Sequence, residues 1–191
     1  MSDMAIDLQI RPITVDEYQR MADAGIIDVD ERIELLDGML VRMPPIGWTH
    51  MFAHERIVRY LVDRLGSAAL IAGQASLPLT ATDEPQPDIT LFRPGTDRKP
   101  KSSWTHADLL GLFELSDSTL RRDSGPKRKA YARGGVAELV IVDLHGARLL
   151  RHREPDGADY RTVDELFAGD RFALEALPDI SLDVSAFLEN S

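Results

Sequence analysis

Two apolar segments of strand length in the middle of the sequence constrain the fold most strongly. Residues 109–116 are strongly apolar and contain a single acid, Glu114, and residues 137–144 form a second segment of this kind. Short apolar runs bounded by turn-forming residues are typical of strands buried in a sheet. They are also far shorter than the roughly 20 residues that a membrane-spanning helix needs. The sequence therefore predicts a sheet with a buried centre and no membrane span.

Composition narrows the class of protein further. The 191 residues are 43% hydrophobic and 28% charged, which is typical of a soluble globular protein, and we expect one domain over residues 1–191. The first ten residues carry acids where a signal peptide carries bases, so we expect a cytoplasmic protein. The chain has no cysteine, which excludes disulfides, thiolate metal sites and thiol catalysis. Any metal must be held by oxygen ligands or by the five histidines.

Charge is distributed unevenly along the chain. The net charge of −10 by itself disfavours a nucleic-acid partner, because affinity for phosphates depends on Lys and Arg. Residues 1–40 hold ten acids and three bases, and residues 154–191 hold ten acids and two bases. Residues 41–153 hold 17 bases and 12 acids, with bases concentrated at residues 93–101 and 121–133. Because the central segment is basic, the negative net charge of the whole chain does not exclude a nucleic-acid partner.

The N-terminal third of the chain carries clear signals for three elements. Thr14 followed by Glu17 predicts a capped helix through Met21. The Asp37-Gly38 pair between two apolar runs predicts a β-hairpin over residues 33–43. Apolar residues at helical spacing predict a long helix over residues 50–65, which ends before a glycine.

The remainder of the chain alternates between strand and helix signals. A helix is expected to begin at Asp123 or Ser124, with Pro126 in its first turn, and to end at Gly134. A short strand near Tyr160 and a small helical piece around Phe187 are expected in the tail. The other expected strands cover residues 69–72, 76–80, 88–93, 109–116, 137–144 and 147–153. This order favours an α/β or α+β fold with a mixed central sheet flanked by helices.

Acidic residues on the apolar strands are the first candidates for chemistry. Glu114 has apolar neighbours on both sides, and Asp88 opens a strand directly after Pro87. A lone carboxylate is costly to bury unless it binds a cation or a donor. If the two strands are neighbours, both carboxylates can face one cleft and hold Mg²⁺ or Mn²⁺, and Lys127 can reach the same cleft. Such a set suits metal-assisted hydrolysis of a phosphodiester.

An ordered set of short motifs carries a resemblance to a known family. The motifs are IELLDG at residues 33–38, PDI at 87–89, FELSDST at 113–119, Lys127 followed by YAR at 131–133, and VIVD at 140–143. In this order and spacing the chain resembles the bacterial "putative restriction endonuclease" family of the PD-(D/E)XK nuclease superfamily, over roughly residues 10–188. The resemblance implies a restriction-endonuclease-like core with a mixed sheet, a cation site and nuclease chemistry.

The resemblance also assigns roles to individual residues. Asp88 and Glu114 match the two acids of the superfamily motif and would be metal ligands, and Glu34 resembles the additional acid that many relatives supply from the N-terminal region. The motif's lysine would stand two residues after Glu114, where this chain has Ser116. In this family the lysine lies on the next helix, and Lys127 occupies that place.

Each candidate also has a purely structural interpretation. Asp88 can be a strand-entry residue after proline, Glu34 can face outward from the hairpin, and Lys127 can belong to a solvated basic face. We expect Tyr131, which shares a helix side with Lys127, to be a core residue. The remaining candidates are His50, an expected neighbour of the active site; His54, expected at the surface; and the basic residues Arg93, Arg98, Lys99, Lys101, Arg121 and Arg122, which can contact phosphates or only solvent.

Taken together, these observations favour an endonuclease that uses Mg²⁺ or Mn²⁺ to hydrolyse DNA. Asp88 and Glu114 would bind the cation, Glu34 would be an accessory acid, and Lys127 would stabilise charge or orient water. The alternative is a catalytically inactive nuclease fold that serves as a binding or regulatory protein, because the strand lysine is missing at Ser116. A homodimer is expected, because paired sites allow a nuclease to address two strands.

Overall fold

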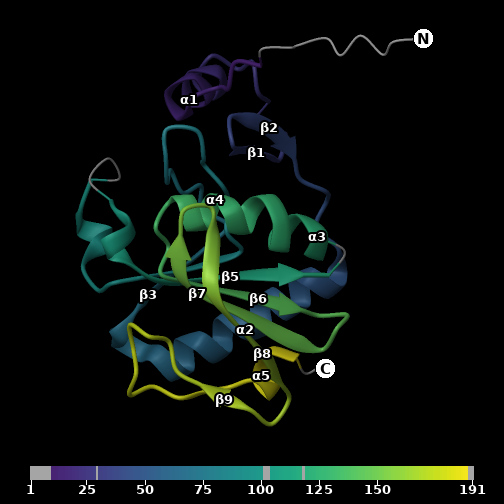
Figure 1. Ribbon diagram of the computed structural model, residues 1–191, viewed down its shortest axis with the longest axis vertical. Helices are drawn as coiled ribbons and strands as arrows, with labels where there is room; N and C mark the ends of the chain where they lie inside the picture. Colours follow the sequence, from purple (N-terminus) through teal and green to yellow (C-terminus); the bar gives the residue numbers. More distant parts are fainter. Residues whose placement is uncertain (1–9, 29, 101–103, 118, 189–191) are drawn as a thin grey trace.

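A six-stranded mixed sheet forms the centre of the computed structural model, which describes residues 10–28, 30–100, 104–117 and 119–188 (Figure 1). Its strand order is β3-β4-β5-β6-β7-β8, and only β5 and β6 are parallel. The strands are β3 (Leu70–Gly73), β4 (Ile89–Phe92), β5 (Leu109–Ser116), β6 (Glu138–Asp143), β7 (Arg148–Asp156) and β8 (Asp159–Phe167). The expected mixed sheet is thereby confirmed.

An N-terminal unit lies on the same side of the sheet as α4 (Arg128–Arg133), beyond that helix (Figure 1). It consists of α1 (Val15–Asp23) and the hairpin of β1 (Ile33–Leu36) and β2 (Met39–Arg42). Thr14 and Glu17 form the expected capping box at the start of α1. Asp37 and Gly38 both have positive φ, as the expected two-residue turn requires. Leu35 connects the hairpin to the chain before β4, because its backbone pairs with that of Glu84.

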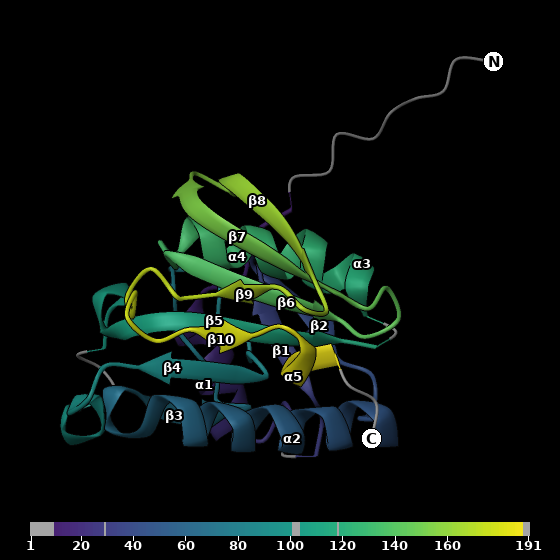
Figure 2. The same ribbon diagram turned by 90° about the horizontal axis from the view of Figure 1, so that it is seen from below.

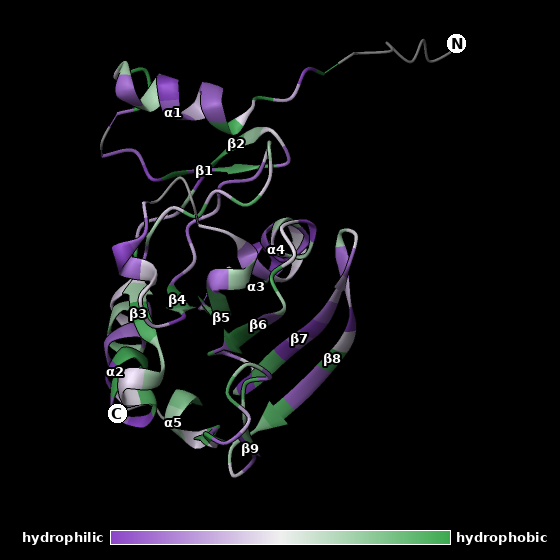
Figure 3. Ribbon diagram, turned by 90° about the vertical axis from the view of Figure 1, so that its left-hand side faces the viewer, coloured by the Kyte–Doolittle hydropathy of each residue, from purple (hydrophilic) through white to green (hydrophobic). Residues whose placement is uncertain are grey.

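The two faces of the sheet carry separate apolar cores. One core packs α2 (Trp48–Leu65) and the C-terminal segment against side chains such as Phe113 and Val140. The other packs α4 (Arg128–Arg133) against alternate residues of the same strands, such as Leu112 and Leu139. The central strands β4, β5 and β6 are the most hydrophobic, whereas β7 and β8 carry more hydrophilic residues (Figure 3). Burial on both faces explains why residues 109–116 and 138–143 are almost continuously apolar.

The connection from β5 to β6 is a composite helix. It begins with α3 (Leu120–Arg122), continues through the π-helical turn η5 (Asp123–Lys127) and ends with α4. Pro126 lies inside η5, where its missing N–H cannot make the usual helical hydrogen bond. π-turns are frequent at functional sites, and here the turn carries Lys127 into the interior.

The C-terminal segment returns to the α2 face of the sheet, as the view from below shows (Figure 2). It contains β9 (Arg171–Phe172), which pairs with β10 (Leu182–Asp183), and the short α5 (Ser185–Leu188). Phe187 in α5 is fully buried and stacks on Phe113 with ring centroids 5.6 Å apart. The expected helical piece around Phe187 is confirmed. Within the described residues, none of the helices has the length and hydropathy of a membrane span.

Three sequence predictions about secondary structure are wrong. Residues 76–80 form an irregular loop, because Leu77 and Leu79 donate to the carbonyls of Pro85 and Asp83 in a local turn instead of joining the sheet. The helix after β5 begins at Leu120, so Asp123 is inside it and does not cap it. The strand at Tyr160 is long, since β8 pairs with almost all of β7.

Stability should decrease in mild acid because of His152 on β7. The ring is buried beside Tyr160, and neither of its nitrogens has a hydrogen-bond partner among the described residues. Burial and the charge of Arg128 lower the pKa of His152 from 6.5 to about 4. As the pH falls between these two values, the unfolded chain gains a proton that the folded protein excludes. The free energy of unfolding should decrease over this window by roughly 3 kcal/mol, at about 1.4 kcal/mol per pH unit.

Urea denaturation of the wild type and His152→Phe at pH 7 and pH 4.5 measures this effect. His152→Phe should reduce the acid-dependent loss, whereas the same change at the exposed His106 should not. Equal acid sensitivity of the wild type and His152→Phe would contradict the prediction.

Candidate functional site

The structure places Asp88 and Glu114 on adjacent antiparallel strands. Asp88 directly precedes β4, and Glu114 lies near the end of β5, so the expected neighbourhood of these strands is confirmed. The backbone N–H of Leu115 donates to Oδ2 of Asp88 at 2.8 Å. His50 in the first turns of α2 contacts the same oxygen through Nε2 at 3.1 Å. Strand pairing and α2 together fix the Asp88 carboxylate.

Lys127 lies at the centre of the buried charges. Its ammonium is 2.7 Å from Oε1 of Glu114 and 3.0 Å from Oε1 of Glu34, and it donates to the carbonyl of Gln86 at 3.0 Å. Lys127, Glu34 and Glu114 are each no more than 1% exposed. The Gln86 N–H also donates to Oε1 of Glu34 at 2.9 Å, whereas Oε2 of Glu34 is buried without a partner among the described residues. The outward-facing and solvated interpretations of Glu34 and Lys127 are therefore wrong.

The pKa shifts follow from burial and from these contacts. Burial disfavours the ammonium of Lys127, but the carboxylates of Glu114 and Glu34 outweigh this effect and raise its pKa. Burial raises the pKa of Glu114 well above its ordinary value, and the charge of Lys127 opposes the rise. Burial also disfavours the charged form of Asp88, yet the hydrogen bond and charge of His50, with the charge of Lys127, lower its pKa. Lys127 therefore remains a cation, and Asp88 an anion, at neutral pH.

A second set of contacts supports Glu114 and the helix that carries Lys127. Tyr131 is fully buried, so it is a core residue as expected. Its hydroxyl also donates to Oε1 of Glu114 and thereby orients the carboxylate. Ser116, at the position of the motif's lysine, donates to Oδ2 of the buried Asp123 at 2.7 Å. Thr119 also donates to Asp123. Ser116 thus anchors the start of the helix that carries Lys127.

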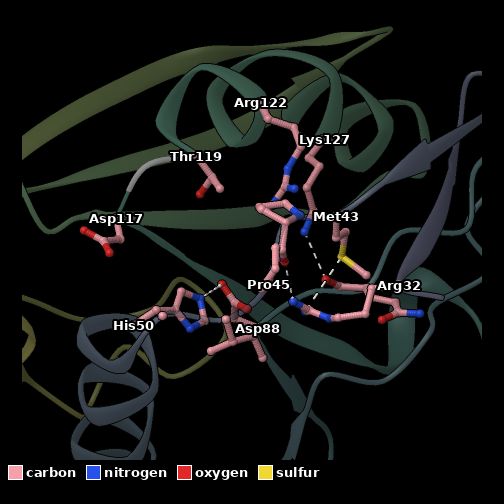
Figure 4. Close-up of a pocket in the computed structure, with 13 residues that line it drawn as sticks. Arg32, Met43, Pro45, His50, Asp88, Asp117, Thr119, Arg122 and Lys127 are labelled. Carbon is pink, nitrogen blue, oxygen red and sulfur yellow. Dashed lines mark hydrogen bonds and ion pairs between the residues drawn. The ribbon is translucent and has the colours of Figure 1, made fainter. Parts of the chain in front are cut away.

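A small cavity of about 50 Å³ opens above Asp88 and Lys127 (Figure 4). Its walls come from the segment between the hairpin and α2, from the start of α2, and from the α3 region. Glu114 lies behind Lys127 and does not line this cavity. The lining residues are Arg32, Met43, Pro44, Pro45, Ile46, Gly47, His50, Gln86, Asp88, Asp117, Thr119, Arg122 and Lys127.

The structure shows which of the remaining candidate residues lie at the site. His50 contacts Asp88, as expected, but His54 is not a surface residue: its side chain is 16% exposed and its Nε2 lies 3.1 Å from the Asp88 carbonyl oxygen. Arg122 lines the cavity. Sequence reasoning missed Arg32, because it precedes the hairpin as an isolated base in an acidic segment. The bases near Arg93 do not line the cavity, and Lys101 lies outside the described residues.

Comparison with known proteins assigns the chain to a family. The family model described as "Putative restriction endonuclease" (Uma2) matches residues 15–185. The chain belongs to the Uma2 family. The family expected from the motifs is thus confirmed, and Asp88, Glu114 and Lys127 all lie inside the matched region.

A solved structure supports the same fold. The chain is similar to a protein of Anabaena variabilis ATCC 29413 described as a "putative nuclease belonging to DUF820", with a TM-score of 0.70 and 12% sequence identity. The similarity covers 92% of this chain and 97% of that protein. A comparison with curated proteins finds no match. At this identity the structural similarity establishes the fold alone, which the Uma2 protein shares with that protein.

The donor chemistry of the site fits a hard divalent cation. Oδ1 of Asp88 and Oε2 of Glu114 accept no hydrogen bond from the described residues, so each carboxylate retains one oxygen for a ligand. The described residues contain no group of three or more His, Cys, Asp or Glu side chains that could hold a metal. Mg²⁺ is commonly held by one or two carboxylates together with water and substrate phosphates. Asp88 and Glu114 could therefore hold a cation of this kind only together with water or substrate oxygens.

The buried charges should be energetically coupled. Lys127→Met leaves Glu34 and Glu114 buried without their shared cation, and we expect it to lower the free energy of unfolding by roughly 3–5 kcal/mol. Adding Glu114→Gln should recover part of this loss, because one of the uncompensated carboxylates is then neutral. Urea denaturation of the two single variants and the double variant gives the coupling energy.

Lys129→Met is the matched control, because Lys129 is exposed on the same helix. If Lys127→Met costs no more stability than Lys129→Met, the ammonium does not stabilise the buried carboxylates.

Proposed function

We propose that this Uma2 protein is an endonuclease that hydrolyses DNA phosphodiester bonds with Mg²⁺ or Mn²⁺. The observation that carries the proposal is that Asp88, directly before β4, and Lys127 of η5 line one cavity, and that Glu114 of β5 contacts Lys127. Membership in a family of restriction-endonuclease-like proteins supports it. Asp88 and Glu114 would hold the cation, which supplies charge neutralisation at the phosphate and a more acidic bound water.

The residues of the chain have separable roles in this proposal. Lys127 is permanently charged and lines the cavity, so its ammonium stabilises negative charge that develops on a phosphate there. Glu34 contacts the ammonium of Lys127, and both side chains are buried. Glu34 is therefore a positioning residue. His50 holds Oδ2 of Asp88 and leaves Oδ1 for a ligand. Tyr131 fixes Glu114 in the same way.

Activity should depend on both carboxylates. Asp88→Asn and Glu114→Gln remove the anionic donors at nearly constant shape. We expect each to reduce the cleavage rate at least about 100-fold, because loss of a group that only supports a metal ligand already reduces metal affinity or activity about 10–100-fold. Cleavage of supercoiled plasmid and of single-stranded DNA with Mg²⁺, with Mn²⁺ and with EDTA measures this. EDTA should abolish cleavage.

Asp63→Asn serves as the matched control, because Asp63 is exposed on α2 away from the cavity. It should cleave like the wild type. If DNA is cleaved and both Asp88→Asn and Glu114→Gln keep the wild-type rate, the assignment is wrong. If the folded wild type binds DNA but does not cleave it with either metal, the inactive binding or regulatory protein is the correct alternative.

A homodimer remains part of the proposal. Two copies of the site would allow the protein to address both strands of a duplex. Sedimentation equilibrium at several protein concentrations should show a mass twice that of one chain at the concentration used for cleavage. A single-chain mass at that concentration would contradict it.

A further inference from the structure

The geometry points to a phosphate clamp formed by Arg32 and Arg122, which holds a phosphodiester of the DNA strand over Asp88. This inference rests on the proposed function and identifies the side chains that would bind its substrate. Neither arginine belongs to the motifs of the sequence or to the buried group around Lys127. Both line the cavity, and Figure 4 shows their guanidinium groups entering it from different walls, near the Lys127 ammonium.

Arg32 is held in place by neutral groups. Its NH1 donates to the carbonyl of Pro44 at 2.7 Å, and its NH2 lies 4.0 Å from the sulfur of Met43. Within the described part of the chain it forms no ion pair with a carboxylate. Arg32 is thus a positioned cation whose charge is not neutralised by an acid.

Arg122 reaches the cavity from α3 and is only partly engaged. Its Nε lies 3.3 Å from Oδ1 of Asp123, and its side chain is 23% exposed. The Asp123 carboxylate is shared with Ser116 and Thr119, which hold its other oxygen. The two terminal nitrogens of Arg122 have no hydrogen-bond partner among the described residues. They are available to two oxygens of one phosphate, which suits the planar fork of a guanidinium.

A second hollow continues the basic surface outward. Its volume is about 470 Å³, and it shares Pro44, Thr119 and Arg122 with the cavity, so the two are contiguous. Arg42 of β2, which forms an ion pair with Glu31, and Arg121 of α3 also line it. Four arginines from the hairpin region and α3 therefore line two adjacent spaces, one of which contains Asp88. In a chain with a net charge of −10, this concentration of cations favours a polyanion as the ligand.

The sizes of the two spaces agree with a strand that enters the site through a phosphate. The cavity above Asp88 is the smaller of the two, at about 50 Å³, and would take a single phosphate group in this inference. The larger hollow can take the neighbouring part of the strand. Phosphate contacts of this kind position the backbone and carry no sequence information. The clamp would therefore set the affinity and the register of the strand at Asp88.

Binding without turnover tests the clamp separately from catalysis. We would measure the anisotropy of a fluorescein-labelled 12-nucleotide strand and of its duplex in EDTA, over a series of salt concentrations. Arg32→Gln and Arg122→Gln should each weaken binding about tenfold or more. Each should also reduce the slope of log K against log salt by about 0.7 for a single strand or about 0.9 for a duplex. The form of DNA that shows these changes is the form that the clamp holds.

Three controls make the result specific. Arg161→Gln removes the same charge on the exposed β7–β8 hairpin and should leave affinity and slope unchanged. A strand with uncharged methylphosphonate linkages should lose the salt dependence with the wild type. Arg122→Lys keeps the charge and should keep the slope but lose affinity, because the bidentate contact is lost.

The possible outcomes separate the clamp from the proposed function. Wild-type slopes in both Arg32→Gln and Arg122→Gln, or no binding of either DNA by the wild type, would overturn the clamp even if cleavage is observed. Loss of slope in these variants supports the clamp even if no cleavage is detected.

Discussion

The ammonium of Lys127 lies between two carboxylates that come from distant parts of the sequence, Glu34 in the hairpin and Glu114 in the central sheet. A buried charge is tolerated only when partners compensate it, so this contact ties three elements together. The hairpin must dock on the segment before β4 for Glu34 to reach Lys127. The composite helix must enter at η5 for Lys127 to reach Glu114. The position of the cavity above Asp88 follows from both requirements.

The mixed topology of the sheet explains how this arrangement arises. Because β5 and β6 are parallel, the chain must cross from the end of one strand to the start of the next, and the composite helix makes this crossing over one face. Glu114 faces that helix, whereas its neighbours Phe113 and Leu115 pack in the core beneath α2. The end of β5 is therefore a place where a carboxylate can be buried and still meet a cation. Asp88 joins it because β4 is the antiparallel neighbour of β5.

Much of the fold could be predicted from local signals. The capping box at Thr14, the Asp37-Gly38 turn and the apolar run of β5 each depend on residues close together in the sequence, and all three were confirmed. The loop at residues 76–80 could not be predicted in this way. Its alternating pattern resembles a strand, but its backbone bonds to residues 83–85 rather than to the sheet. The start of the helix at Leu120 could not be predicted either. Pro126 is typical of the first turn of a helix, but here it lies in a π-turn inside the helix.

The sequence by itself determined most of the elements, the family motifs and the identity of the candidate acids, because these depend on residue type and spacing along the chain. Only the tertiary structure decided what those side chains do to one another. The contact of Lys127 with Glu34, the contact of His50 with Asp88, and the position of Arg32 and Arg122 in the lining of one cavity all depend on residues separated by many positions. Such contacts depend on strand order and helix docking, which local patterns do not encode. The same reason explains why an acidic chain can present a basic cavity: folding, rather than composition, selects the charges that meet there.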